Sequence, residues 1–203
     1  MSVARGTLSL DRLGLQLFGG KASASGRYFT AADPAHPTLS LAASIAKASF
    51  PRTFEEIEAV RQLAPIFEKA SGDYSLSIDM RTTLDAAMSP DLMSLTAQGE
   101  ISSENVSVEG VEVFDKLADL LKNDKLRRIE ARDLKIRFSI KDGRVTTEPF
   151  DLKMGDVNVN MSGTTGLDRT IDYTAKVTLP AGVGGVLGAV NVGIGGTFTS
   201  PKI

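Results

Sequence analysis

The sequence predicts a mainly β protein of the α+β class. It is built on a large, curled and mostly antiparallel sheet that forms a groove, with two helices packed on it or capping it. Three observations lead to this fold class. Apolar and polar residues alternate with a period of two in several segments, turn-forming residues separate those segments, and only two segments carry helical periodicity. The 203 residues are enough to bury a sizeable core.

Each alternating segment places apolar side chains on one face and polar side chains on the other, which is typical of an antiparallel sheet with one face in water. The apolar positions are Leu39, Leu41, Ala43 and Ile45; Tyr74, Leu76, Ile78 and Met80; Leu134, Ile136, Phe138 and Ile140; Val157, Val159 and Met161; and Ile171, Tyr173, Ala175, Val177 and Leu179. Lys141-Asp142-Gly143-Arg144 predicts a tight hairpin, because Asp-Gly suits the positive φ values of a two-residue turn. The glycine-rich stretch 182–196 carries enough Val, Leu and Ile to favour a strand or short helix over a flexible linker.

Two segments interrupt the alternation with helical spacing. In the first, Thr53-Phe54-Glu55-Glu56 has the form of a capping box, in which the Thr53 hydroxyl accepts from the amide of Glu56 and Glu56 reaches back. Apolar residues then recur at helical spacing, and Pro65 should kink or split this helix because it lacks an N–H. The second helix is expected from about Val111 to Lys122.

These elements predict a single domain, residues 1–203, that we expect to be a fragment of a longer chain. In order, it contains a β-meander (1–50), a helix (51–70), strands (71–110), a second helix (111–123) and a second β-meander (126–203). No apolar run approaches the roughly 18–20 residues that span a bilayer. Because strand-like alternation already begins at Val3, we expect the full-length product to carry a membrane helix or export signal upstream.

Composition excludes several kinds of site. The formal net charge is −2, so nothing indicates a phosphate-binding surface, and no nucleic-acid partner is expected. The chain has no cysteine, which excludes disulfides, iron–sulfur clusters and thiolate zinc sites. We expect neither a metal nor a cofactor.

The candidate catalytic groups have simpler structural explanations. The single histidine, His36, lies between two prolines, and no neighbour in the sequence both orients an imidazole and gives it a reactive partner. Carboxylates are paired at Glu55–Glu56 and at Asp85 with Asp91, but the first pair lies in the first turn of a helix, where negative charge is favoured anyway. We therefore expect a protein that is not an enzyme and has no catalytic residue.

Two further patterns suggest binding only superficially. The glycines of 182–188 lack the Gly-Lys-Ser/Thr ending of a phosphate-binding loop. The basic residues between Lys125 and Arg137 are interleaved with acids, so a solvated strand face explains them better than a surface for anionic headgroups.

The apolar face of the sheet is the remaining candidate site. Two short helices cannot cover about ten short strands, and a twisted sheet of that size must curl, split or close. The face therefore either folds into an ordinary filled core or stays open as a groove for acyl chains, and the pattern alone slightly favours the filled core. The residues expected to share this face are Leu76, Ile78, Ile136, Phe138, Val157, Val159, Tyr173 and Val177.

A series of short elements, none of them diagnostic alone, occurs along nearly the whole chain. They are Ala4 to Leu10; Leu15 to Tyr28, with Phe18-Gly19-Gly20 and Gly26; Thr53 to Lys69; Gly72 to Leu76; Met88 to Leu95; Ile101 to Leu121; Phe138 to Val145; and Gly195 to Phe198 with Pro201. In this order they resemble the carboxy-terminal region of the AsmA family. The chain departs from that family in lacking its amino-terminal membrane helix and long middle region, and the stretch before Gly195 is shorter than usual.

The resemblance implies a non-enzymatic envelope protein related to bridge-like lipid transfer proteins. It implies a periplasmic location, with an inner-membrane anchor outside this sequence. It also implies a role in phospholipid transport and outer-membrane homeostasis through an apolar β-groove, with phospholipid acyl chains as the partner. On this expectation the eight residues of the apolar face are lipid-facing. The alternative is a protein-interaction module that binds envelope proteins and assists outer-membrane protein assembly through exposed strand edges.

Overall fold

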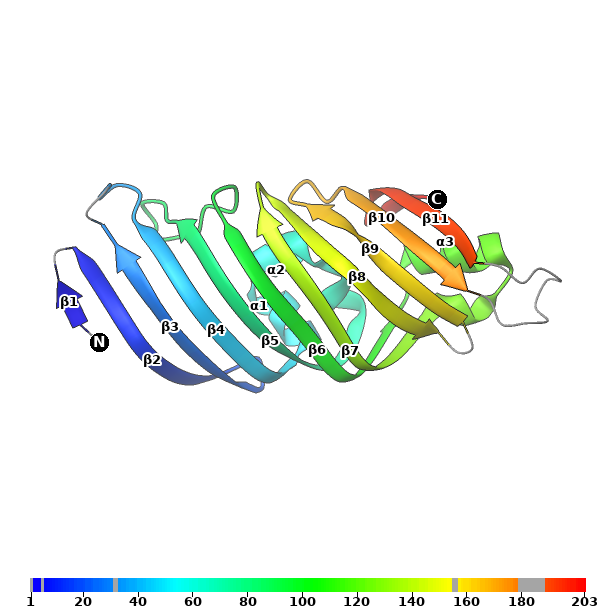
Figure 1. Cartoon of the computed structure of the whole chain (residues 1–203), viewed down its shortest axis with the longest axis horizontal. Coiled ribbons are helices and arrows are strands. Elements are labelled where there is room, and N and C mark those ends of the chain that lie inside the picture. Colours follow the sequence, from blue (N-terminus) through cyan, green and yellow to red (C-terminus); the bar gives the residue numbers. More distant parts are fainter. Residues whose placement is uncertain (1, 5, 31–32, 155–156, 179–188) are drawn as a thin grey trace.

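The computed structural model describes residues 2–4, 6–30, 33–154, 157–178 and 189–203. Twelve strands form one sheet in which the spatial order follows the chain order from β1 to β12 (Figure 1). They are β1 (Ser2–Ala4), β2 (Thr7–Leu17), β3 (Gly20–Phe29), β4 (Thr38–Ser49), β5 (Ala70–Thr83), β6 (Thr96–Glu109), β7 (Arg128–Lys141), β8 (Arg144–Met154), β9 (Val157–Gly166), β10 (Ile171–Thr178), β11 (Ala189–Thr197) and β12 (Ser200–Lys202). Neighbouring strands are antiparallel, which confirms the predicted fold class.

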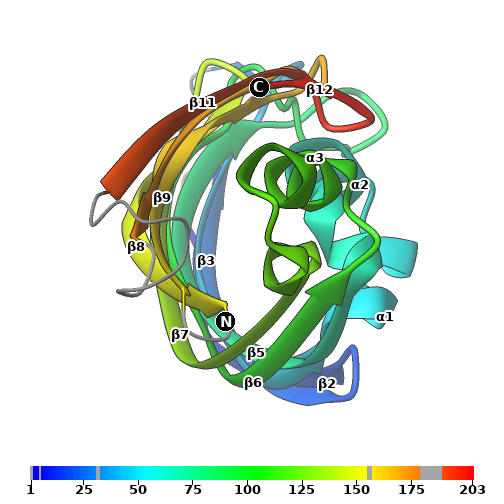
Figure 2. The same ribbon diagram turned by 90° about the vertical axis from the view of Figure 1, so that its right-hand side faces the viewer.

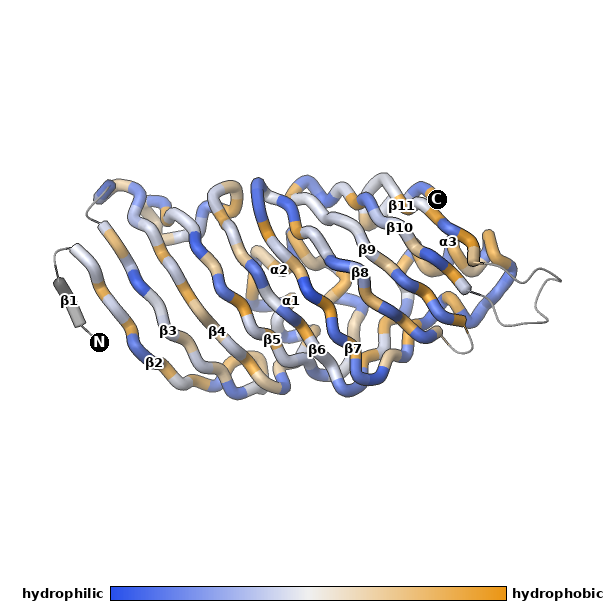
Figure 3. The backbone as a smooth tube through the Cα atoms, in the orientation of Figure 1, coloured by the Kyte–Doolittle hydropathy of each residue, from blue (hydrophilic) through white to orange (hydrophobic). Residues whose placement is uncertain are grey.

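The sheet is curled, and the helices lie on its concave side (Figure 2). They are α1 (Phe50–Glu56), α2 (Glu58–Leu63), the 3₁₀ helix η1 (Pro65–Lys69), α3 (Glu112–Leu121) and the 3₁₀ helix η2 (Asp124–Arg127). Hydrophobic and hydrophilic residues alternate along many strands (Figure 3). Since successive side chains of a strand point to opposite faces, this alternation sends the apolar set to the helices and the polar set to the outer side.

The five predicted alternating segments all lie in strands, namely β4, β5, β7, β9 and β10. The predicted hairpin is confirmed as well: Asp142 and Gly143 join β7 to β8 with φ values of 51° and 68°. Leu179 and residues 182–188 of the glycine-rich stretch lie outside the described residues, whereas residues 189–196 belong to β11.

The predicted capping box at Thr53 is wrong. Helix α1 begins earlier, at Phe50, and Ser49 occupies the N-cap position without a side-chain capping bond. Thr53 is buried inside the helix, where its hydroxyl donates to the Ser49 carbonyl oxygen at 2.8 Å and lies 2.7 Å from the Tyr74 hydroxyl. Because the single Thr53 proton is used on Ser49, the Tyr74 hydroxyl donates to Thr53. Burial raises the pKa of Tyr74.

Thr53→Ala is therefore expected to destabilise the domain through a lost buried hydrogen bond rather than a lost cap. The change leaves the buried Tyr74 hydroxyl without this partner, which should cost about 1–3 kcal/mol in the free energy of unfolding. Urea denaturation measures it, with Glu56→Ala as the matched control, since Glu56 is exposed and has no capping role. Equal losses for the two variants would restore the capping box.

The predicted first helix is divided into three short ones. Pro65 begins η1, so the split expected there is confirmed. A second break lies at Ile57, where φ is −113° and ψ is 111°. Neither proline nor glycine occurs at this break, so the sequence did not predict it. The second predicted helix matches α3, which ends in a left-handed residue, Lys122, with φ 49°.

Buried apolar side chains form two clusters beneath the helices. The larger one joins Phe50 of α1 and Phe114 of α3 to strands from β4 to β11. The smaller one joins Leu63 of α2 to Leu95, Ala97 and Ile140. Both clusters lie on the concave side, and the degree of burial on that side differs from strand to strand.

Candidate functional site

Three of the eight predicted lipid-facing residues are closed off in the core. Val157 and Val177 are 0% exposed and Val159 is 2% exposed, and all three belong to the larger cluster with Phe114 and Leu117 of α3. At this end of the sheet the filled-core arrangement is the correct one. The physical reason is that α3 has an apolar stripe of its own, which seals the strands it faces.

The other five predicted residues are half-buried. Leu76 and Tyr173 pack against the larger cluster, and Ile78 and Phe138 pack against the smaller one. Ile136 is paired with Ile101 in the ladder between β6 and β7. The structure thus brings the predicted residues to one face, but the helices divide that face instead of leaving one continuous apolar surface.

Strands β2, β3 and β4 hold an apolar surface that the sequence analysis did not assign as a site. Ladder partners place the leucines of β2 beside Tyr28 and the small residues of β3, which in turn lie beside β4. We call this surface the open strip, and its members are Leu8, Leu10, Leu13, Leu15, Leu17, Ala24, Tyr28, Leu39, Leu41 and Ala43. All of them are half-buried or exposed, with Leu13 at 42% and Leu17 at 39%.

A β-bulge hid most of the open strip from sequence reading. Strict alternation stops after Leu10 and resumes at Leu13, because the register between β2 and β3 shifts at this point. Asp11 and Arg12 occupy the bulge and lie beside the outward-facing Ser23 and Ser25. The bulge keeps all five leucines on one face although their spacing is irregular. A search that allowed one inserted residue would have found them.

Helix α1 bounds the open strip on the side of β4 and β5. Its Phe50 ring packs on two other aromatic rings, with centroids 4.9 Å from Phe67 of η1 and 4.8 Å from Tyr74 of β5. The Phe67 and Tyr74 centroids are 5.4 Å apart, which completes a three-ring contact. Contacts of this type hold helix and sheet together, so the strip ends against a packed wall.

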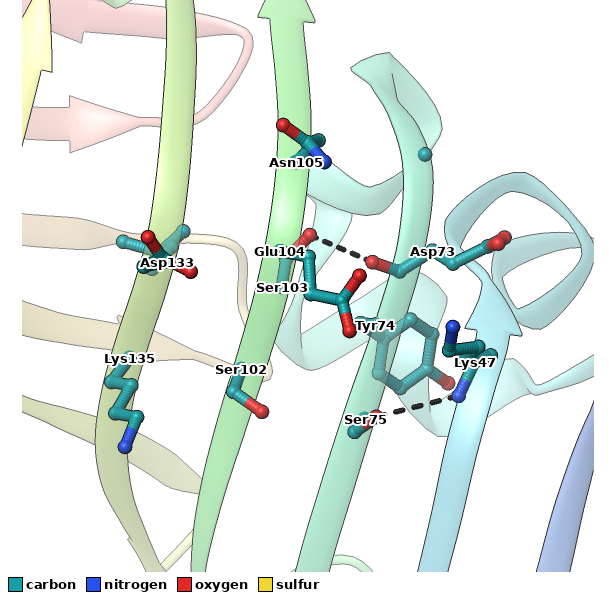
Figure 4. Close-up of a pocket in the computed structure, with 12 residues that line it drawn as sticks. Lys47, Asp73, Tyr74, Ser75, Ser102, Ser103, Glu104, Asn105, Asp133 and Lys135 are labelled. Carbon is teal, nitrogen blue, oxygen red and sulfur yellow. Dashed lines mark hydrogen bonds between the residues drawn. The ribbon is translucent and has the colours of Figure 1, made fainter.

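A polar crease runs across the outer face of β4 to β7 (Figure 4). It follows three neighbouring irregularities: register shifts after Ile45 and after Gly72, and a missing ladder pair between Glu104 and Asp133. The crease forms a half-open pocket of about 410 Å³. Its lining residues are Lys47, Gly72, Asp73, Tyr74, Ser75, Ser102, Ser103, Glu104, Asn105, Asp133, Leu134 and Lys135.

The remaining candidate groups are placed as turn and surface residues. The His36 imidazole lies 2.9 Å from the Asp33 carboxylate, and this hydrogen bond is the main cause of the lowered pKa of Asp33. Asp85 accepts from the amides of Ala87 and Ser89, which closes the loop before β6. In the part of the chain that the structure describes, no group of three or more His, Cys, Asp or Glu side chains is placed to hold a metal ion.

The basic residues between Lys125 and Arg137 are largely paired with acids. Arg127 lies 2.5 Å from Asp119, 3.0 Å from Asp124 and 3.4 Å from Asp115. These partners, Asp119 foremost, hold the pKa of the Arg127 guanidinium above its ordinary value. Arg137 lies 3.1 Å from Glu100 on the outer face. Such exposed pairs are solvated and leave little net positive surface.

No protein-family model, curated protein or solved structure matches the chain. The likeness to the AsmA family therefore remains an expectation from the sequence. Within the described ranges, none of the helices has the length and apolar character needed to cross a bilayer.

Proposed function

We propose that the chain is a segment of a hydrophobic surface that carries the acyl chains of phospholipids. The observation that supports this most is the open strip, where five leucines of β2 lie beyond the helices that the structure describes (Figure 1). Contiguous apolar surface of this kind is unusual on a monomer and commonly marks a binding site.

Chemically, the strip suits a non-directional ligand. Its members are Leu, Ala and one Tyr, so burial of apolar area is the main attraction it can offer. That force, about 25 cal/mol per Å², distinguishes poorly between headgroups. We therefore expect loose binding of many lipids, which suits a surface along which molecules pass, and no chemical step.

The wider role proposed here follows from the family resemblance. On this proposal the full-length protein is periplasmic and anchored to the inner membrane. It takes part in phospholipid transport and outer-membrane homeostasis. The structure adds a restriction to this proposal. Because the helices and the larger cluster fill the concave side around Val159, lipid would contact the β2–β4 end of the sheet instead.

Site-specific photo-crosslinking with a phospholipid analogue in vesicles tests the proposal. Single photoreactive residues at Leu15 and Leu41 face the strip, and the adjacent positions Gln16 and Ser40 face outward as matched controls. We expect several-fold stronger labelling at Leu15 and Leu41. Equal labelling of the two sets, or none at the strip, would contradict the proposal.

The interaction-module alternative has one observation in its favour. In the described structure, β1 pairs with β2 along Thr7–Ser9. The outer edge of the rest of β2, Leu13–Leu17, has no partner strand there. Unpaired backbone groups of an edge strand can accept an added strand from another protein. Absence of lipid labelling at the strip would favour this alternative.

A further inference from the structure

Five charged side chains line the polar crease on the outer face, namely Lys47, Asp73, Glu104, Asp133 and Lys135. Lys47 and Glu104 come from β4 and β6, and Asp73 belongs to β5 between them. Among the described residues no ion pair or hydrogen bond joins these three side chains to any other group. On the same outer face, by contrast, Arg137 and Glu100 pair directly at 3.1 Å. These three charges thus line the pocket without a paired counter-charge in the described residues.

Two non-glycine residues of the crease have strained backbone angles. Lys47 has φ 58° and Asp133 has φ 52°, in the left-handed region that favours glycine. Gly72, beside them, adopts φ 106° without a side chain. Glycine at Lys47 would allow the same bulge at lower cost, since non-glycine residues in this region carry strain of about 1 kcal/mol or more. The chain thus keeps a charged side chain at a position where glycine would be less strained.

The arrangement across β5 defines what the cavity can hold. Figure 4 shows Glu104 reaching from β6 towards β5, with Lys47 on the other side of that strand. Ser75 of β5 and Ser102 of β6 also line the pocket, and the Ser75 hydroxyl accepts from the Lys47 amide at 3.4 Å. The backbones of β4 and β6 are separated by two strand spacings, about 9–10 Å. A ligand that spans them must carry opposite charges at its two ends.

We propose that the crease binds a small linear zwitterion, with its cationic end on Glu104 and its anionic end on Lys47. The distance between the two charges of the ligand must be less than the separation of the β4 and β6 backbones, about 9–10 Å, because the side chains of Lys47 and Glu104 take up part of it. The hydroxyl of Ser75, which lies beside Lys47, supplies an additional hydrogen bond to the anionic end. This site lies on the face opposite the open strip, so it does not depend on the proposed lipid function.

The test uses ω-amino acids of increasing length, from glycine through 4-aminobutyrate to 6-aminohexanoate, added to the isotope-labelled chain. Amide NMR signals of Lys47, residues 73–75 and residues 102–104 should shift in a saturable way, with one chain length preferred. Because the charged groups are exposed, we expect a Kd on the order of 1 mM for the best member. Hexanoate and hexylamine, which carry one charge each, should bind at least about tenfold more weakly.

Variants separate the crease from the rest of the surface. Lys47→Gly should abolish the shifts while leaving the thermal midpoint unchanged or higher, because it removes the ammonium and relieves the strain together. Glu104→Gln should also abolish them, and Lys153→Gln, an exposed lysine of β8 outside the crease, should not. Absence of saturable shifts in the unaltered chain up to about 20 mM, or equal binding by all variants and by the singly charged analogues, would overturn the proposal.

Discussion

Val177→Asp is expected to unfold the domain, whereas the same substitution at Leu13 should leave it folded. Val177 is 0% exposed and lies in the larger cluster, where a carboxylate would find neither water nor a counter-charge. An unpaired buried charge costs several kcal/mol, comparable with a total stability of about 5–15 kcal/mol. Circular dichroism and urea denaturation would show the loss of cooperative unfolding.

Leu13→Asp is the matched control, because Leu13 faces the same side of the sheet but is 42% exposed. Its carboxylate stays in water, so we expect the free energy of unfolding to change by no more than about 1 kcal/mol. The same variant should reduce lipid labelling at Leu15, since the charge interrupts the apolar strip. If Leu13→Asp unfolded the chain as Val177→Asp does, the strip would be part of a closed core.

Phe114→Ala is expected to lower the free energy of unfolding by about 3–5 kcal/mol, because truncating a buried aromatic ring leaves a cavity that the surroundings refill only partly. Phe114 is 4% exposed and belongs to the helix face that closes the concave side. Denaturant unfolding monitored by circular dichroism measures the loss.

Leu120→Ala in the same helix is the control, since Leu120 is 58% exposed. It should change stability by no more than about 0.5 kcal/mol. Similar effects at the two positions would mean that α3 does not pack on the sheet through Phe114, and the filled part of the concave side would then be open.

Several parts of the fold could be read from the sequence because they depend on local patterns. The alternation in β5 or β10 repeats along one strand, and the Asp142-Gly143 turn uses the conformational freedom of two adjacent residues. Helix α3 has an apolar stripe over ten residues, enough to be recognised without its partners. Each of these signals lies within one element.

The start of α1 could not be predicted in the same way. Thr53 has the sequence neighbours of an N-cap, but its hydroxyl is used by Ser49 and Tyr74, and Tyr74 is 21 residues away. Threonine suits an N-cap, where its hydroxyl accepts from a backbone amide, and it also suits a position inside a helix, where its hydroxyl donates to a backbone carbonyl of the preceding turn. Only the packing of α1 on β5 decides between them.

The sequence by itself determined that one face of the sheet is apolar, and it named residues that share that face. The tertiary structure alone decided which of them are open. Val177 and Leu13 carry equally apolar side chains, yet the first lies beneath the helices and the second lies beyond the wall formed by Phe50. Hydrophobic periodicity reports the direction in which a side chain points. Its exposure depends on elements distant in the chain, whose position is set by three-dimensional packing.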